Sequence, residues 1–137
     1  MGIEMKKIVI DTNVYIPSLI FGGIPLEAVI WCQNYASIFI SLDIINEIKG
    51  VLEYKFLFTE DEIREIIEAI VSPAEIVFPK KKINLFDVEG DNKIIECAIE
   101  SGSEFIISGD QKHLIKLRNY KGIEILTHKE FLERFKF

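Results

Sequence analysis

Four acidic residues stand where carboxylates could act together. Asp11 and Asp110 each follow a short apolar run that is typical of a buried parallel strand. Glu47 borders the apolar stripe of one predicted helix, and Asp91 begins the stripe of another. In an open α/β sheet such positions share the edge at the carboxyl ends of the strands, where ligands bind. We therefore expect the four carboxylates to converge.

Converging carboxylates define the chemistry that this edge could perform. Carboxylates that converge without Lys or Arg between them repel one another strongly unless divalent cations hold them. Hard oxygen ligands, without a Cys/His cluster of zinc spacing, select Mg²⁺ or Mn²⁺. The chemistry natural to such a site is attack of metal-activated water on a phosphoryl centre.

Each acidic residue also has a simpler explanation. Asp11, Asp91 and Asp110 lie at predicted helix starts, where aspartate is a favoured cap of backbone N–H groups. Glu47 could pack its stem against the apolar stripe while its carboxylate reaches water. Taken singly, each residue leaves both explanations open, and only the set of four favours a shared metal.

Short apolar runs alternate with helical patterns along the chain. Strands are expected at 6–10, 37–40, 75–78, 105–108 and 123–126, and helices lie between and after them. The helix at 25–35 carries Leu26, Val29 and Ile30 on one face. Ser41, Thr59 and Thr127 are expected to cap helices. The pattern predicts a three-layer α/β/α sandwich with a central, mostly parallel sheet of four to five strands, as a single domain over residues 1–137.

Composition narrows the class of protein. The chain has 137 residues, 49% of them hydrophobic and 28% charged, which is typical of a globular rather than a disordered protein. A net charge of −6 argues against a generally basic nucleic-acid binder. Nucleic acid stays possible as a substrate, because the site carboxylates count as negative while bound cations are not counted.

Cysteine use and hydropathy favour a cytoplasmic protein. Cys32 and Cys97 are expected to be buried free thiols in a reducing compartment. The most apolar region, 15–32, is interrupted by Pro17 and Pro25, so no membrane span or membrane partner is expected. Met5 is an alternative start, with residues 1–4 as an extension.

In their order and spacing, these motifs resemble the PIN-domain family typified by VapC-like toxins. The resemblance extends from Ile8 to Phe131. It rests on Glu47 and on the segments Ile8-Val9-Ile10-Asp11-Thr12-Asn13, Gly90-Asp91-Asn92-Lys93-Ile94-Ile95-Glu96-Cys97-Ala98, Ile107-Ser108-Gly109-Asp110, Ile125-Leu126-Thr127 and Glu130-Phe131-Leu132.

The resemblance implies an activity and a set of site residues. Asp11, Glu47, Asp91 and Asp110 match the four acidic metal-site positions of the family, Glu47 less securely because other acids share its helix. The family implies an endoribonuclease that depends on Mg²⁺ or Mn²⁺. It is often a homodimer and often neutralised by an antitoxin encoded beside it.

Neighbouring polar residues have supporting roles in the same resemblance. Asn13 matches the amide that supports the first aspartate, Ser108 matches the hydroxyl before the last, and Thr12 is a minor helper. Asn92 stands where some relatives carry a further acid, which implies that a second metal would be held weakly.

A basic cluster follows the last acid. Lys112, Lys116 and Arg118 could contact RNA phosphates, although a solvated helix face is the simpler explanation for each. His113 and His128 are expected at the surface, with His113 close enough to Asp110 to touch substrate.

Two other functions compete with the nuclease. A haloacid-dehalogenase-type phosphatase needs a second aspartate two residues after the first, and Asn13 stands there instead. A catalytically silent PIN scaffold that binds RNA or a partner protein is the better alternative.

Overall fold

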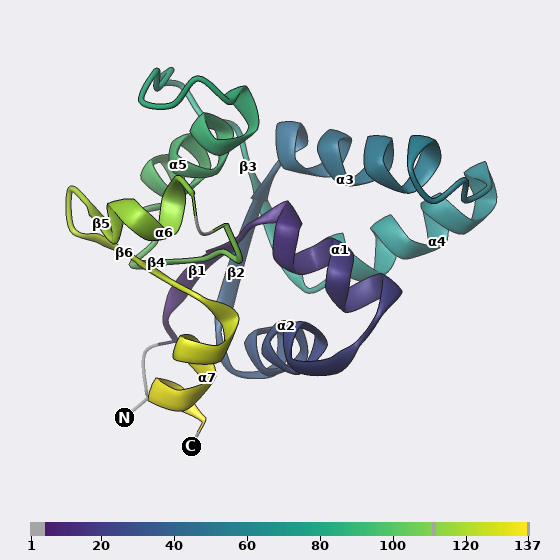
Figure 1. Cartoon of the computed structure of the whole chain (residues 1–137), viewed down its shortest axis with the longest axis horizontal. Coiled ribbons are helices and arrows are strands. Elements are labelled where there is room, and N and C mark those ends of the chain that lie inside the picture. Colours follow the sequence, from purple (N-terminus) through teal and green to yellow (C-terminus); the bar gives the residue numbers. More distant parts are fainter. Residues whose placement is uncertain (1–4, 111, 137) are drawn as a thin grey trace.

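A six-stranded sheet forms the centre of the computed structural model, which describes residues 5–110 and 112–136 (Figure 1). The spatial order is β3-β2-β1-β4-β6-β5. Five strands run parallel, and β5 pairs antiparallel with β6. The strands are β1 (Lys7–Ile10), β2 (Ser37–Ser41), β3 (Ala74–Val77), β4 (Phe105–Ile107), β5 (Asn119–Tyr120) and β6 (Ile123–Leu126).

Helices cover both faces of the sheet, which confirms the predicted α/β/α class. One face packs against α5, and the other packs against α2 and α7, with α1 beside α2 (Figure 1). The pair α3 and α4 extends to one side. The helices are α1 (Thr12–Ile20), α2 (Gly23–Tyr35), α3 (Leu42–Tyr54), α4 (Glu60–Val71), α5 (Glu89–Ser101), α6 (Leu114–Leu117) and α7 (His128–Phe135).

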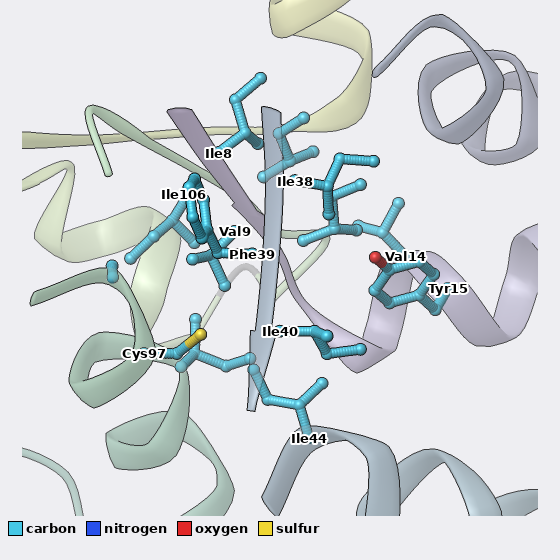
Figure 2. Close-up of a cluster of buried hydrophobic side chains, with 14 of the residues drawn as sticks. Ile8, Val9, Val14, Tyr15, Ile38, Phe39, Ile40, Ile44, Cys97 and Ile106 are labelled. Atoms are coloured by element: carbon cyan, nitrogen blue, oxygen red, sulfur yellow. The ribbon is translucent and has the colours of Figure 1, made fainter. Parts of the chain in front are cut away.

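Strands β1 and β2 are buried from both sides, as expected for parallel strands between two helical layers. Figure 2 shows Phe39 on the same side as Cys97 of α5, whereas Ile38 and Ile40 face Tyr15 of α1. Both cysteines are buried free thiols, as predicted. Burial on both faces also fixes β1 in the sheet, and Asp11, the residue after β1, therefore lies at the carboxyl edge.

Helix ends follow the predicted caps. Ser41 accepts a hydrogen bond from the N–H of Ile44 at 3.3 Å. Thr59 and Thr127 each form a complete capping box, which begins α4 and α7 respectively. Gly102 ends α5 in the left-handed conformation with φ of 67°.

Two details differ from the sequence prediction. The sheet has a sixth strand, β5, because two residues after α6 turn back onto β6; a two-residue strand has no periodicity to recognise. In α2 the buried residues are Ala28, Val29 and Cys32, while Leu26 and Ile30 are exposed. The helix is therefore rotated relative to the apolar face that was predicted.

No single helix among the described residues is long and apolar enough to cross a membrane. Helices α1 and α2 satisfy that criterion only when taken together, and they are bent by 112° at the break between them.

Candidate metal centre

The pairing of β1 with β4 brings two of the predicted site segments together. Ile10 and Ile107 are register partners, so the residues that follow them emerge side by side. The N–H of Asp11 donates to the carbonyl of Ile107 at 2.9 Å. The hydroxyl of Ser108 donates to Oδ2 of Asp11 at 2.8 Å. Asp11 and Ser108 therefore lie together at the carboxyl ends of the adjacent strands β1 and β4.

Asp11 is almost completely buried, with 5% of its surface exposed. Burial raises its pKa to about 7, and the nearby carboxylates of Glu47 and Asp91 act in the same direction. The Ser108 hydroxyl and, more weakly, the N–H of Asn13 offset only part of this effect. Asp11 precedes α1, yet its side chain makes no capping hydrogen bond. A helix cap therefore does not account for its position.

Glu47 of α3 faces the same edge. Thr12 donates its hydroxyl hydrogen to Oε2 of Glu47 at 3.2 Å, so Thr12 supports Glu47 rather than Asp11. A methyl group at Gly90 of α5 would lie 3.2 Å from Oε1 of Glu47, so α5 passes close beside this carboxylate. Burial raises the pKa of Glu47, opposed by Thr12 and reinforced by Asp91. Glu47 therefore belongs to the acidic cluster.

Asp91 and Asp110 meet at a histidine. Asp91 lies in the first turn of α5, whose cap position is Val88, so Asp91 is not the predicted cap. Nδ1 of His113 lies 2.8 Å from Oδ2 of Asp91 and 3.5 Å from Oδ2 of Asp110. One ligand atom from each of these three residues lies within 4.8 Å of the others, a spacing that could hold a metal ion. Burial and the charge of Asp110 raise the pKa of Asp91, partly offset by His113.

Asp110 is held differently from Asp11. Burial acts to raise its pKa, but the N–H groups of Leu114, Lys112 and His113 donate to its carboxylate and bring the pKa below its usual value. These hydrogen bonds measure 3.0 to 3.1 Å. The cap position of α6 is His113, so Asp110 is not the predicted helix cap. Its carboxylate instead accepts hydrogen bonds from the N–H groups of the turn that leads into α6, and Oδ2 also lies 3.5 Å from Nδ1 of His113.

Asn13 and Ser108 fasten the loop that carries Asp110 to the start of α1. Oδ1 of Asn13 accepts a hydrogen bond from the N–H of Gly109 at 2.9 Å. The buried Ser108 oxygen accepts one from the N–H of Asp110 at 3.0 Å while its hydrogen is given to Asp11. Ser108 therefore links the first and last acids of the motif.

Comparison with known proteins assigns the family. The family model of the PIN domain matches residues 7–112, which include every acid described above. The chain belongs to the PIN-domain family.

Similar proteins agree with this assignment. The PIN domain is 37% identical over 143 residues to an uncharacterized protein, MJ1680, of Methanocaldococcus jannaschii, covering 94% of this chain and 91% of that protein. Its fold is similar to a chain in the crystal structure of VapBC2 from Rickettsia felis bound to a DNA fragment from their promoter, with a TM-score of 0.62, 14% identity, and coverage of 87% and 96%. The structure of PAE2754 from Pyrobaculum aerophilum aligns with a TM-score of 0.54, 15% identity, and coverage of 95% and 88%.

The donor set of this PIN domain fits a divalent cation. PIN domains are generally nucleases that use divalent metals. Among the described residues, the group with the spacing of metal ligands is Asp91, Asp110 and His113. Burial raises the pKa values of Asp11, Glu47 and Asp91, and hydrogen bonds within the fold offset this only in part. A cation bound among these carboxylates would offset the rest.

Asn92 has a structural task in this PIN domain. Its Oδ1 accepts hydrogen bonds from the N–H groups of Leu85 and Phe86, and its Nδ2 donates to the carbonyl of Phe86. These hydrogen bonds explain why Asn92 is buried, without the weak binding of a second metal that the resemblance implied.

The loop 78–88 is anchored to α5 at further points. Glu96 accepts from the N–H of Ile83 at 2.9 Å, and Glu100 accepts from the N–H of Lys80 at 2.9 Å. In Figure 1 this loop projects beyond the start of α5. Its end places the Phe86 ring 5.6 Å from the His113 ring, beside the acidic cluster.

The proposed RNA-contacting residues divide into two kinds. Nη1 of Arg118 donates to both carboxylate oxygens of Glu130, at 2.8 and 3.0 Å, so this side chain is engaged in an ion pair. Lys112 and Lys116 are exposed and have no ion-pair partner within the described part of the chain. The sequence placed His113 near Asp110 as a surface residue able to touch substrate, and the structure adds its contact with Asp91.

Proposed function

We propose that this PIN domain is a metal-dependent endoribonuclease whose Mg²⁺ or Mn²⁺ is held by Asp11, Glu47, Asp91 and Asp110. The observation that carries the proposal is the uncompensated negative charge at the carboxyl edge of β1 and β4. Asp11 is buried there beside Glu47 and Asp91, and burial raises its pKa to about 7, which is typical of a carboxylate at a functional site.

The chain's own residues would prepare the site. A bound cation supplies activated water and neutralises charge on the phosphate. Ser108 orients Asp11, Thr12 orients Glu47, and three backbone N–H groups orient Asp110. Lys112 and Lys116 lie beside this cluster in sequence and are available to contact phosphate oxygens.

The biological setting follows from the same proposal. We propose a cytoplasmic toxin that forms a homodimer and is neutralised by an antitoxin. The similarity of fold to a chain of the VapBC2 complex supports the antitoxin part of this proposal. Co-expression with the product of an adjacent small gene, followed by purification as one complex, would test the antitoxin part.

The nuclease is tested by incubating the purified chain with single-stranded and structured RNA in Mg²⁺, Mn²⁺ or chelator. We expect cleavage that requires metal and falls at least about 1000-fold in Asp11→Asn, because removal of groups that act as a unit costs several kcal/mol. Unchanged cleavage in Asp11→Asn would identify a contaminating nuclease and contradict the assignment.

Two substitutions on α3 that remove the same charge distinguish a role in the metal site from a general effect of charge. Glu47→Gln should lose at least about 100-fold in activity, whereas Glu53→Gln, an exposed change of the same charge on the same helix, should lose less than about 2-fold. Metal-independent RNA binding without cleavage by the wild type would instead identify a silent scaffold.

A further inference from the structure

We infer that His113 is a direct ligand of the cation, so that the centre has a mixed oxygen and nitrogen donor set and prefers Mn²⁺ to Mg²⁺. The inference rests on the proposed metal centre and adds a residue that the four-carboxylate assignment lacks.

The spacing of the donor atoms supports coordination. Nδ1 of His113 lies 2.8 Å from one carboxylate oxygen of Asp91 and 3.5 Å from one of Asp110. With metal–ligand distances of about 2.1 Å, two adjacent ligands of an octahedral cation lie about 3.0 Å apart. The two measured separations are close to this value. Little movement is needed to place all three atoms around one ion.

Both the backbone and the ring of His113 have partners in the fold. The backbone N–H of His113 donates to Oδ2 of Asp110 at 3.1 Å, and the following residue, Leu114, is fully buried, so the turn that carries the ring is fixed. Across the site, the Phe86 ring contacts the imidazole from the anchored loop 78–88. A histidine with no role beyond solubility would not require both constraints.

The imidazole nitrogen is the reason to expect a preference for Mn²⁺ over Mg²⁺. Mg²⁺ binds oxygen ligands and keeps several waters. Mn²⁺ also favours oxygen ligands, but as a first-row transition metal it accepts an imidazole nitrogen more readily than Mg²⁺ does. Replacing one oxygen ligand by His113 would therefore strengthen Mn²⁺ binding relative to Mg²⁺. A site with carboxylates alone lacks this added preference for Mn²⁺.

The competing interpretation is that the imidazolium of His113 takes the place of a cation. It would then bridge Asp91 and Asp110 only in the metal-free protein and leave them when the metal binds. The two interpretations differ in one measurable quantity, the coupling between Mn²⁺ and a ring nitrogen in the metal-bound protein.

The deciding experiment is electron spin-echo envelope modulation of Mn²⁺ bound to tag-free protein without RNA. The chain has two histidines, so His128→Asn leaves His113 as its single imidazole. We expect this variant and the wild type to show the ¹⁴N modulation of a coordinated imidazole. Absence of that modulation with Mn²⁺ bound would overturn the inference.

Affinity gives a second, independent test. We expect His113→Asn to weaken Mn²⁺ binding about 10-fold or more while changing Mg²⁺ binding less than about 3-fold. Equal losses for both ions would contradict the inference. Neither test uses cleavage: nitrogen coupling without nuclease activity would refute only the proposed function, and cleavage without nitrogen coupling would refute only the role of His113.

Discussion

Asp11 and Asp110 occupy the same place in two neighbouring strand–helix units, yet the fold treats them in opposite ways. Each follows a buried strand at the carboxyl edge of the sheet. Asp110 receives three backbone N–H groups, and its pKa is lowered. Asp11 makes no capping hydrogen bond and is nearly inaccessible, and burial raises its pKa to about 7.

The difference shows what a strand-end aspartate can be used for. The charge of Asp110 stabilises the turn that carries it, so its presence needs no ligand. The charge of Asp11 opposes folding in the absence of a cation. Metal binding is therefore indicated more strongly by the poorly compensated Asp11 than by Asp110, although the two sequence motifs are alike.

The largest expected effect concerns Asp11 in metal-free protein. Its pKa is about 7 in the folded chain and near 3.8 in the unfolded chain, so the folded state binds more protons between these values. Stability should fall as pH rises from about 4 to about 7, by an amount on the order of 4 kcal/mol. Chemical denaturation in chelator across this range would measure it.

Asp11→Asn should remove the contribution of Asp11 from that pH profile, leaving the smaller slope due to Glu47 and Asp91, and should raise the metal-free stability at pH 8. Asp87→Asn, which removes an exposed loop carboxylate, is the control and should keep the wild-type profile. If wild-type stability is constant from pH 4 to pH 7, Asp11 is not buried as a poorly compensated charge.

Asp110→Ala should lower the metal-free stability, whereas Asp11→Asn should raise it. Loss of the acceptor for three N–H groups is expected to lower the metal-free stability by about 1–2 kcal/mol at pH 7. Because the folded pKa is lowered, the wild-type contribution is present above pH 4 and disappears as the pH falls through the folded value. If Asp110→Ala instead raised the stability, Asp110 would oppose folding as Asp11 does, and the proposed difference between the two aspartates would be wrong.

Ser108→Ala should affect both aspartates, since the hydroxyl donates to Asp11 and accepts from the N–H of Asp110. We expect a loss of about 1–3 kcal/mol and a further rise in the pKa of Asp11. The Asp11 carboxyl resonance in an NMR titration would measure the pKa. Ser101→Ala, at another buried serine, should leave that titration unchanged.

The smallest effect is expected for Asn13→Ala, which removes one acceptor at the exposed N–H of Gly109. Stability should fall by about 0.5–1.5 kcal/mol, with Asn34→Ala as a control on an exposed helix position. Thermal denaturation is sufficient to measure both. A larger loss than for Ser108→Ala would mean that Asn13, rather than Ser108, joins the two aspartates.

The fold class and the convergence of the acids followed from simple rules. Buried β-branched runs predicted parallel strands, and parallel strands place their carboxyl ends together. That rule brought Asp11 and Asp110 to one edge without knowledge of any contact. The capping boxes of Thr59 and Thr127 were predictable because they are local in sequence.

Features that depend on distant approach were not predictable in the same way. The contact of His113 with Asp91 requires the first turn of α5 to lie against the turn before α6. The rotation that exposes Leu26 and Ile30 depends on how α2 packs in three dimensions. Asn92 resembled a site position in sequence, but its amide binds the backbone of a loop.

The loop 78–88 has a consequence for motion near the metal centre. The amide protons of Lys80, Ile83 and Phe86 are held by side chains of α5 rather than by a neighbouring strand. Each exchanges with solvent only when the loop separates from the helix. Because the Phe86 ring lies against the His113 ring, the same separation uncovers one side of the imidazole, which keeps its contact with Asp91. Hydrogen exchange at these amides therefore measures how often the loop 78–88 moves away from α5 beside the metal centre.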